Sequence, residues 1–246
     1  MTIQFKEDPD LMFLQFCEEN ELKLLCSYLT HDPNDGKQRI SCELLNDKRY
    51  KILDGDPEQH RKCWHLIAAE LQLYGGDTLI NNTIRRGKGV LYREILCDVL
   101  DANKIKHNKA ESIHELEKLL LEKISSDIIK QMSPEDRAVF DVQYATSPNA
   151  AASICLDGVH YNPAALWAII SIFVRELASK YFGQGAAYAA MAAIGRQAAA
   201  FVVPIAVILA ALTTVPLITG PAKRITSGAC VLIAWLRNKR INNNMF

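Results

Sequence analysis

The chain has 246 residues, 49% of them hydrophobic, which suffices for one large domain or two modest ones with buried cores. Its 28 basic and 28 acidic residues cancel overall, but residues 151–246 carry eight basic and two acidic groups, giving +6 there and −6 before them. Seven cysteines, odd in number and without a CxxC pair, exclude a zinc ribbon and a complete disulfide framework and indicate buried reduced thiols.

Helical spacing of apolar residues predicts two short packed helices between Asp8 and Thr30, followed by a polar turn over 31–38. The strongest helix signal begins at Asp56, which can cap a helix that has Pro57 at its first position. This helix is expected to end at the glycine pair 75–76, and Asp77 is expected to cap another.

After a basic glycine loop at 85–89, the pattern predicts a helix whose inward face is Leu91, Ile95, Leu96 and Val99. A capping box over 112–115 opens a long amphipathic helix to about residue 132, and the Ser-Pro pair at 133–134 starts the next. No stretch alternates polar and apolar residues as a strand would.

We therefore expect an all-α protein with an acidic soluble multi-helix domain over 1–146, a linker over 147–160 and a basic, apolar, alanine-rich helical bundle or hairpin cluster over 161–246. Four apolar helical segments crowd the last region, at 161–174, 181–195, 198–220 and 225–236. In the second of them Gly185, Ala189 and Ala193 form a small-residue face that favours close helix packing.

Residues 197–222 contain no charged side chain, and this length suffices for a membrane crossing, although Pro204 and Pro216 interrupt it. The first interpretation is membrane association, with Lys223 and Arg224 contacting lipid phosphate. In that case a cytoplasmic C-terminus is favoured by five basic residues, Lys223, Arg224, Arg237, Lys239 and Arg240. The alternative is a hairpin buried inside a soluble bundle. Four side chains face either lipid or an apolar core: Phe201, Ile205, Leu209 and Leu212.

The candidate sites for chemistry are weak. His60 and His65 lie five residues apart, about 140° around a helix, so that a structural role is favoured over a metal site with Cys63 and Glu70. The loop with Arg85, Arg86 and Lys88 lacks a phosphate-loop motif and is interpreted as a solvated turn, with phosphate or lipid contact as the alternative. No catalytic residue, metal or cofactor is expected.

A long segment, DGDPEQHRKCWHLIAAELQLYGGDTLINNTIRRGKGVLYREILCDVL, resembles the central signature of the bacterial YaaW family of uncharacterised proteins. The opening DPDLMFLQFCEENELKLLCSYLT and the later PLITGPAKRITSGACVLIAWLR resemble the two ends of the same family, which is classified beside the ubiquinol-cytochrome c chaperones. The resemblance implies an all-helical, non-enzymatic protein whose signature, over 54–100, binds a partner through the aromatic anchors Trp64, Tyr74 and Tyr92. The long apolar C-terminal half departs from those chaperones.

The leading hypothesis is a chaperone- or assembly-factor-like interaction protein, cytoplasmic or at the inner membrane, that contacts a protein partner or an apolar client. No nucleic-acid partner is expected, and oligomer formation is left open. The runner-up is a pore-forming protein or effector whose segments from Tyr161 to Leu236 insert as hairpins. A third class, an enzyme, requires four side chains to converge on one cleft: His60, Glu70, Asp77 and Arg93.

Overall fold

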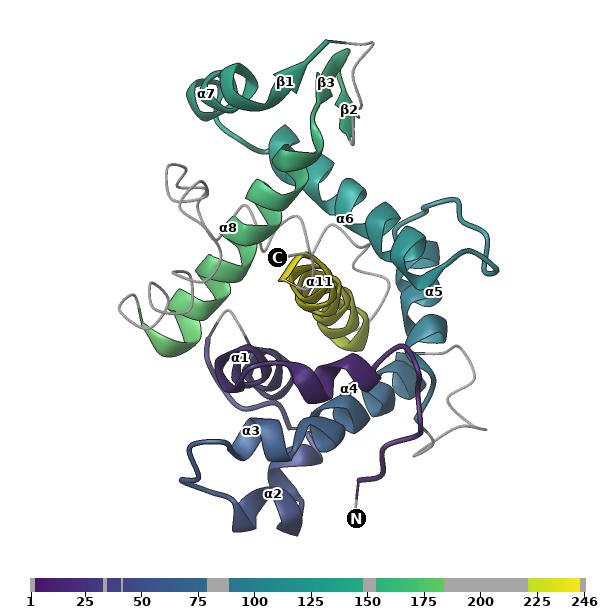
Figure 1. Cartoon of the computed structure of the whole chain (residues 1–246), viewed down its shortest axis with the longest axis vertical. Helices are drawn as coiled ribbons and strands as arrows, with labels where there is room; N and C mark the ends of the chain where they lie inside the picture. The colour runs from purple at the N-terminus through teal and green to yellow at the C-terminus, as the bar shows by residue number, and fades with distance from the viewer. Residues whose placement is uncertain are drawn as a thin grey trace. The chain divides into compact units, whose positions relative to one another are not determined.

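The computed structural model describes residues 3–32, 35–40, 42–78, 89–147, 154–183 and 221–243. These residues form two compact units. Unit 1 comprises Met1–Glu117 and Pro216–Phe246, and unit 2 comprises Lys118–Val215. The described chain is mostly helical, as predicted, with one small sheet that was not predicted (Figure 1).

Unit 1 begins with the two short helices expected from the leucine spacing, η1 (Met12–Phe16) and α1 (Glu19–Thr30). A capping box starts α1, because the backbone N–H of Glu18 donates to Oε2 of Glu21 at 2.7 Å. Leu22, Leu25 and Leu29 are fully or almost fully buried on its inner face. These predictions are confirmed.

The next helices of unit 1 are η2 (Leu44–Asn46), α2 (Lys48–Ile52), α3 (Gln59–Lys62) and α4 (Trp64–Thr78). The single helix predicted from Asp56 is thus broken at Cys63, and Asp56 accepts a turn hydrogen bond from the Glu58 N–H at 2.8 Å. The predicted end at Gly75 is also wrong, since α4 continues to Thr78 and Asp77 lies inside it.

Gly75 has a packing role in the last turn of α4. A Cβ at this position would lie 2.4 Å from Cγ1 of Ile95 and 2.8 Å from Cγ2 of Val90. The missing side chain lets α4 and α5 (Tyr92–Ala102) approach closely. Of the inward residues predicted for this helix, Ile95, Leu96 and Val99 are buried, whereas Leu91, the N-cap residue of α5, is only half-buried.

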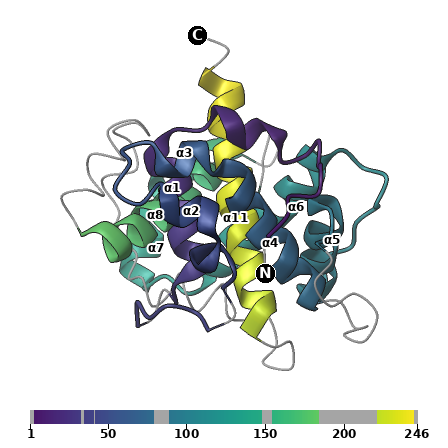
Figure 2. The same ribbon diagram turned by 90° about the horizontal axis from the view of Figure 1, so that it is seen from below.

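Helix α6 (Ile113–Lys130) starts at the predicted capping box, where Oγ of Ser112 accepts from the Glu115 N–H at 3.2 Å, and the boundary between the units falls within it. The C-terminal helix α11 (Pro221–Asn243) returns to unit 1 and packs against α4, α1 and α5 (Figures 1 and 2). The composition predicts a separate C-terminal region at 161–246, whereas the contacts of α11 are with the N-terminal helices.

Unit 2 includes α7 (Pro134–Tyr144), which Ser133 caps by accepting from the Asp136 N–H at 3.0 Å, and α8 (Pro163–Phe182). Between them lies an antiparallel sheet in the order β1-β3-β2, formed by β1 (Ala145–Thr146), β2 (Ile154–Leu156) and β3 (Val159–Tyr161). The strands have two or three residues each, too few for an alternating pattern, and two of them fall within the predicted linker.

Several predictions concern residues outside the described ranges. They include the basic loop with Arg85, Arg86 and Lys88, the small-residue face at 185–193 and the apolar positions Phe201, Ile205, Leu209 and Leu212. The side chains of Lys223 and Arg224 are outside them as well. Within the described ranges, no helix is both long enough and apolar enough to cross a membrane.

Candidate functional site

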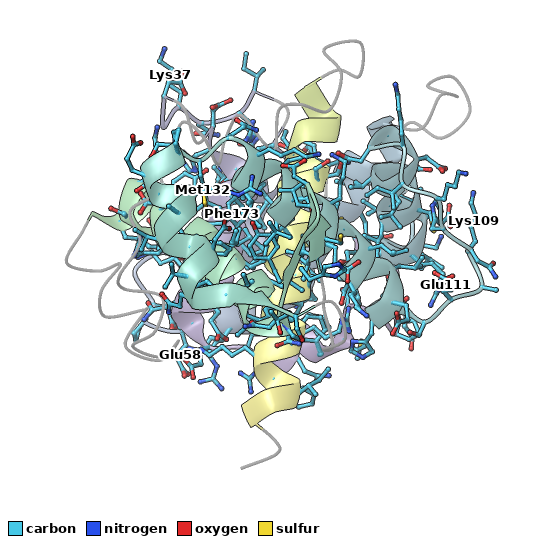
Figure 3. All side chains as sticks on the ribbon, turned by 90° about the horizontal axis from the view of Figure 1, so that it is seen from above. Lys37, Glu58, Lys109, Glu111, Met132 and Phe173 are labelled. Carbon is cyan, nitrogen blue, oxygen red and sulfur yellow. The ribbon has the colours of Figure 1, made fainter. Side chains whose placement is uncertain are left out.

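The most distinctive part of unit 1 is the apolar middle of α11. Every residue from Ile225 to Arg237 is buried, on all sides of the helix. A helix that is buried on all sides requires neighbours on all sides, and α1, α4 and α5 are its neighbours in unit 1. By contrast, Lys37, Glu58, Lys109 and Glu111 lie at the outer rim and point away from the ribbon (Figure 3).

Helix α11 lies close against α1 at Gly228. A Cβ at this position would lie 2.0 Å from Oη of Tyr28 and 2.4 Å from its Cζ. Tyr28 is itself buried, so its ring has little room to move. The neighbours Ser227 and Ala229 are also small and fully buried, which gives this turn of α11 a narrow cross-section.

At its C-terminal end, α11 presents a buried cation to a buried carboxylate. Nε of Arg237 donates to both carboxylate oxygens of Glu117, at 3.1 and 3.0 Å, and the two side chains are only 10% and 5% exposed. Nη2 of Arg237 also donates to the backbone carbonyl of Asp10 at 2.5 Å. The guanidinium therefore ties α11 to the start of α6 and to the N-terminal segment.

Aromatic rings complete this site. The guanidinium carbon of Arg237 lies 4.3 Å from the centroid of the Phe13 ring, within cation–π range. The hydroxyl of Tyr92 donates to Oε1 of Glu117 at 2.9 Å. Burial raises the pKa of Glu117, and the charge of Arg237 and the hydrogen bond from Tyr92 partly oppose that rise.

Two residues further on, a second ion pair, between Lys239 and Glu21, connects the same end of α11 to α1. Nζ of Lys239 donates to Oε1 of Glu21 at 2.5 Å, with side chains 13% and 7% exposed, and Nη2 of Arg240 lies 3.9 Å from Oε2. Glu21 thus serves both the capping box of α1 and the cations of α11. Cations near a helix C-terminus also interact favourably with its dipole.

We call this surface the α11 docking surface. It comprises the faces of α1, α4 and α5 that contact α11, with Tyr28 opposite Gly228 and with Glu117 and Glu21 opposite Arg237 and Lys239. The surface receives the apolar stretch of α11, and the buried carboxylates of Glu117 and Glu21 lie at the end that receives its cations.

Buried polar side chains connect α4 and α5, two helices of the docking surface, to other segments of unit 1. Asp8 accepts from the backbone N–H of Tyr92 at 2.6 Å, which fixes the N-terminal segment to the first turn of α5. Gln72 of α4 pairs with both backbone groups of Lys6, at 2.9 and 2.8 Å. Glu70 of α4 accepts from the N–H groups of Glu43 and Leu44, at 3.1 and 2.8 Å.

Glu70 provides a pH-dependent contribution with a defined sign. Burial raises its pKa, so the folded protein binds this proton more tightly than the unfolded chain. The resulting stability is present at low pH and is lost as the pH rises through the folded-state pKa. We therefore compare how the denaturant midpoint changes between pH 5 and 8 in the wild-type chain and in Glu70→Gln. The change in the wild-type chain is expected to be more negative than the change in Glu70→Gln, because only the wild-type chain can lose the Glu70 proton.

Chemical denaturation at four pH values in this range measures the difference between the two chains. The comparison is needed because His65, whose pKa burial lowers, contributes a slope of the opposite sign to both chains. Equal pH slopes in the two chains would show that the Glu70 proton is not linked to folding.

A separate chain of polar side chains joins α1 to α2 and α3. Nδ1 of His60 pairs with Oε1 of Glu19, Nε2 of His60 lies 3.1 Å from the Tyr50 hydroxyl, and that hydroxyl lies 3.4 Å from Sγ of Cys26. The order resembles a nucleophile relay, but burial raises the pKa of Cys26 to about 12, which disfavours the thiolate. Its geometry indicates a structural network.

The four residues that the enzyme hypothesis needs have different surroundings. His60 contacts Glu19, Glu70 contacts backbone N–H groups, and Arg93 donates to the carbonyls of Lys109 and Glu111, at 3.1 and 2.6 Å. The side chain of Asp77 is outside the described ranges. The described residues contain no cluster of three metal-ligating side chains.

The three predicted aromatic anchors are placed differently. Tyr74 and Tyr92 are buried inside unit 1, whereas Trp64 keeps exposed surface and packs edge-on against Phe5, with ring centroids 5.3 Å apart. Tyr92 is instead part of the Arg237 site. Sequence reasoning missed Glu117, Arg237, Glu21 and Lys239 as a group, because the paired residues are 120 and 218 positions apart.

The chain matches one domain model and several bacterial proteins that share the family name UPF0174. Residues 5–40 match the model of a domain described as Domain of unknown function (DUF3944), a segment that contains η1, α1, Glu21 and Tyr28. The chain is 42% identical over 140 residues to the UPF0174 protein YaaW of Escherichia coli K12. The aligned region covers 57% of this chain and only 58% of that protein.

Two relatives from Helicobacter pylori match over longer stretches. A UPF0174 protein of strain J99 is 29% identical over 96% of this chain and 93% of its own length. Another, from strain 26695, is 30% identical over 80% of this chain and 97% of its own length. No solved structure matches the chain.

Proposed function

We propose that this chain, which belongs to the UPF0174 family of bacterial proteins, is a non-enzymatic interaction protein that shields apolar helices, as a chaperone or assembly factor does. A single observation carries the proposal. The docking surface of unit 1 packs against an apolar helix, α11, whose residues from Ile225 to Arg237 are all buried. A surface that packs against one apolar helix has the chemistry to accept another.

Two features support a role in binding. The main polar groups of unit 1 serve structure: Glu70 and Asp8 bind backbone N–H groups, and Glu117 binds Arg237. The thiols of Cys17, Cys26 and Cys42 are buried, and burial raises their pKa values to about 12. Neither group of residues is arranged as an activated acid, base or nucleophile.

In this proposal α11 occupies the docking surface at rest, and a client helix displaces it. The intact chain should therefore bind a client more weakly than a chain whose own α11 is loosened, since only the open fraction can bind. We expect the intact Arg237→Gln chain to bind a fluorescent leucine-alanine helical peptide at least tenfold more tightly than the wild-type chain. Anisotropy titration measures the affinities, and a glutamate-lysine-alanine helix is the control peptide.

If neither chain binds the apolar peptide, or if both bind the polar peptide equally well, the proposed function is wrong. The same comparison must be made with chains shown by circular dichroism to be folded. A bound apolar peptide that quenches or shifts the fluorescence of Trp235, which lies on α11, would indicate that α11 moves when the client binds.

The proposal includes membrane association of the C-terminal region, since residues 197–222 carry no charge and a basic pair follows at 223–224. Cell fractionation with a carbonate wash tests it on the whole chain and on a chain lacking 198–222. We expect only the whole chain in the membrane pellet. Recovery of both chains in the supernatant would contradict membrane association and leave the helix-binding proposal intact.

Pore formation is the less favoured function. The continuously buried part of α11, Ile225 to Arg237, is about 20 Å long, whereas the apolar core of a bilayer is about 30 Å thick. This buried apolar stretch alone is too short to span a bilayer. Release of a dye from anionic vesicles by the purified chain would favour pore formation over helix binding.

A further inference from the structure

The contacts of α11 define a spacing along the helix. Gly228 lies against Tyr28, Arg237 follows nine residues later against Glu117, and Lys239 follows two residues after that against Glu21. At about 1.5 Å per residue, the glycine and the arginine lie about 13 Å apart along the axis. The residues between them, from Ala229 to Leu236, are apolar and buried.

Each contact excludes a different kind of wrong helix. A side chain larger than glycine at the first position meets the buried Tyr28 ring. A neutral residue at the second leaves the Glu117 carboxylate, with 5% exposure, without its cation. An acidic residue at the third faces Glu21. Steric and charge exclusion together give a surface specificity that apolar contact alone cannot provide.

We propose that the α11 docking surface selects a partner helix by this pattern: a glycine, an apolar run of about eight residues, and basic residues nine and eleven positions after the glycine. The chemistry matches an apolar helix that ends in a basic flank, the form in which membrane-inserted helices reach the bilayer surface. The carboxylates also set direction, because only one orientation of the helix brings its cations to Glu117 and Glu21. This inference rests on the proposed function and names its client class.

The experiment uses the intact Arg237→Gln chain as acceptor and fluorescent peptides that copy residues 221–243. The native peptide restores the missing cation, so we expect it to bind at least tenfold more tightly than a peptide with Arg237→Gln and Lys239→Gln. A peptide with Gly228→Leu should lose a similar factor because of the Tyr28 contact. A peptide with Ile241→Ala is the matched control, since Ile241 is 38% exposed.

A second intact acceptor, Gly228→Ala, loosens α11 sterically and leaves Arg237 in place, so the test survives if one acceptor fails to fold. A charge exchange adds a direct readout: the Glu21→Lys form of either acceptor should prefer a peptide with Lys239→Glu over the native peptide. The preference should weaken at high salt.

The outcomes separate the two proposals. If no peptide binds either folded acceptor, the proposed function fails. If the neutral and Gly228→Leu peptides bind as tightly as the native one, the surface accepts any apolar helix, and the pattern proposed here is wrong. Exchange of α11 between two copies would appear as a dimer in light scattering and would identify a second copy of this chain, instead of a separate client, as the occupant.

Discussion

Replacing Arg237 by alanine is expected to lower the free energy of unfolding of unit 1 by about 3–5 kcal/mol. The reason is the carboxylate that remains. Glu117 has 5% of its side chain exposed and would lose a cation that donates to both of its oxygens. Removal of one member of a buried pair costs far more than the pair itself contributes, because the other charge stays buried without compensation.

Denaturant unfolding followed by tryptophan fluorescence measures this effect. The chain has three tryptophans, and replacing Trp64 and Trp167 by phenylalanine leaves Trp235 of α11 as the reporter. The matched control is Arg240→Ala on the same helix. Its side chain is 33% exposed, and its Nη2 lies 3.9 Å from Oε2 of Glu21, so a loss of at most about 1 kcal/mol is expected. Equal losses in the two variants would show that the Arg237 site does not hold α11.

A double variant distinguishes the pair from its surroundings. Glu117→Leu with Arg237→Met removes both charges and replaces them with side chains of comparable length. We expect it to lose clearly less stability than the sum of the two single substitutions, since neither charge is left alone. Additive losses would instead indicate that the two side chains act independently, through Tyr92, Phe13 and the Asp10 carbonyl.

Local signals in the sequence predicted much of the fold because caps and apolar spacing act within a few residues. Ser112 and Ser133 mark the starts of α6 and α7, and the buried positions of α5 follow the helical period. The break at Cys63 and the very short strands have no comparable local signature. Gly75 was predicted to end a helix but lies inside α4, where it permits close packing. The sequence alone does not distinguish these two roles of a glycine.

The site itself was not predictable from local patterns. Glu117 belongs to an amphipathic helix in which charged residues ordinarily face solvent, and Arg237 is one of the basic residues that suggested a cytoplasmic C-terminus. Their pairing appears only when α11 returns to unit 1. The uncharged run from 197 to 222 suggested a membrane, whereas the apolar helix that follows it, α11, contacts α1, α4 and α5.

Replacing Gly228 by alanine is expected to destabilise unit 1 by about 1–3 kcal/mol, although the same change in an exposed helix would stabilise it by about 1 kcal/mol through helix propensity. The clash decides the sign. The new Cβ would lie 2.0 Å from the Tyr28 hydroxyl and 2.4 Å from the ring carbon that bears it, and the ring is buried. Either α11 or α1 must then shift.

Unfolding followed by Trp235 measures the loss, and a second substitution identifies its cause. Tyr28→Leu shortens the side chain and removes the atoms nearest to the added methyl group. By itself Tyr28→Leu should destabilise by leaving a cavity, but together with Gly228→Ala the loss should be smaller than the sum of the two. A gain of stability in Gly228→Ala alone would mean that α1 and α11 are not in close contact at this position, and the steric part of the recognition pattern would then have no basis.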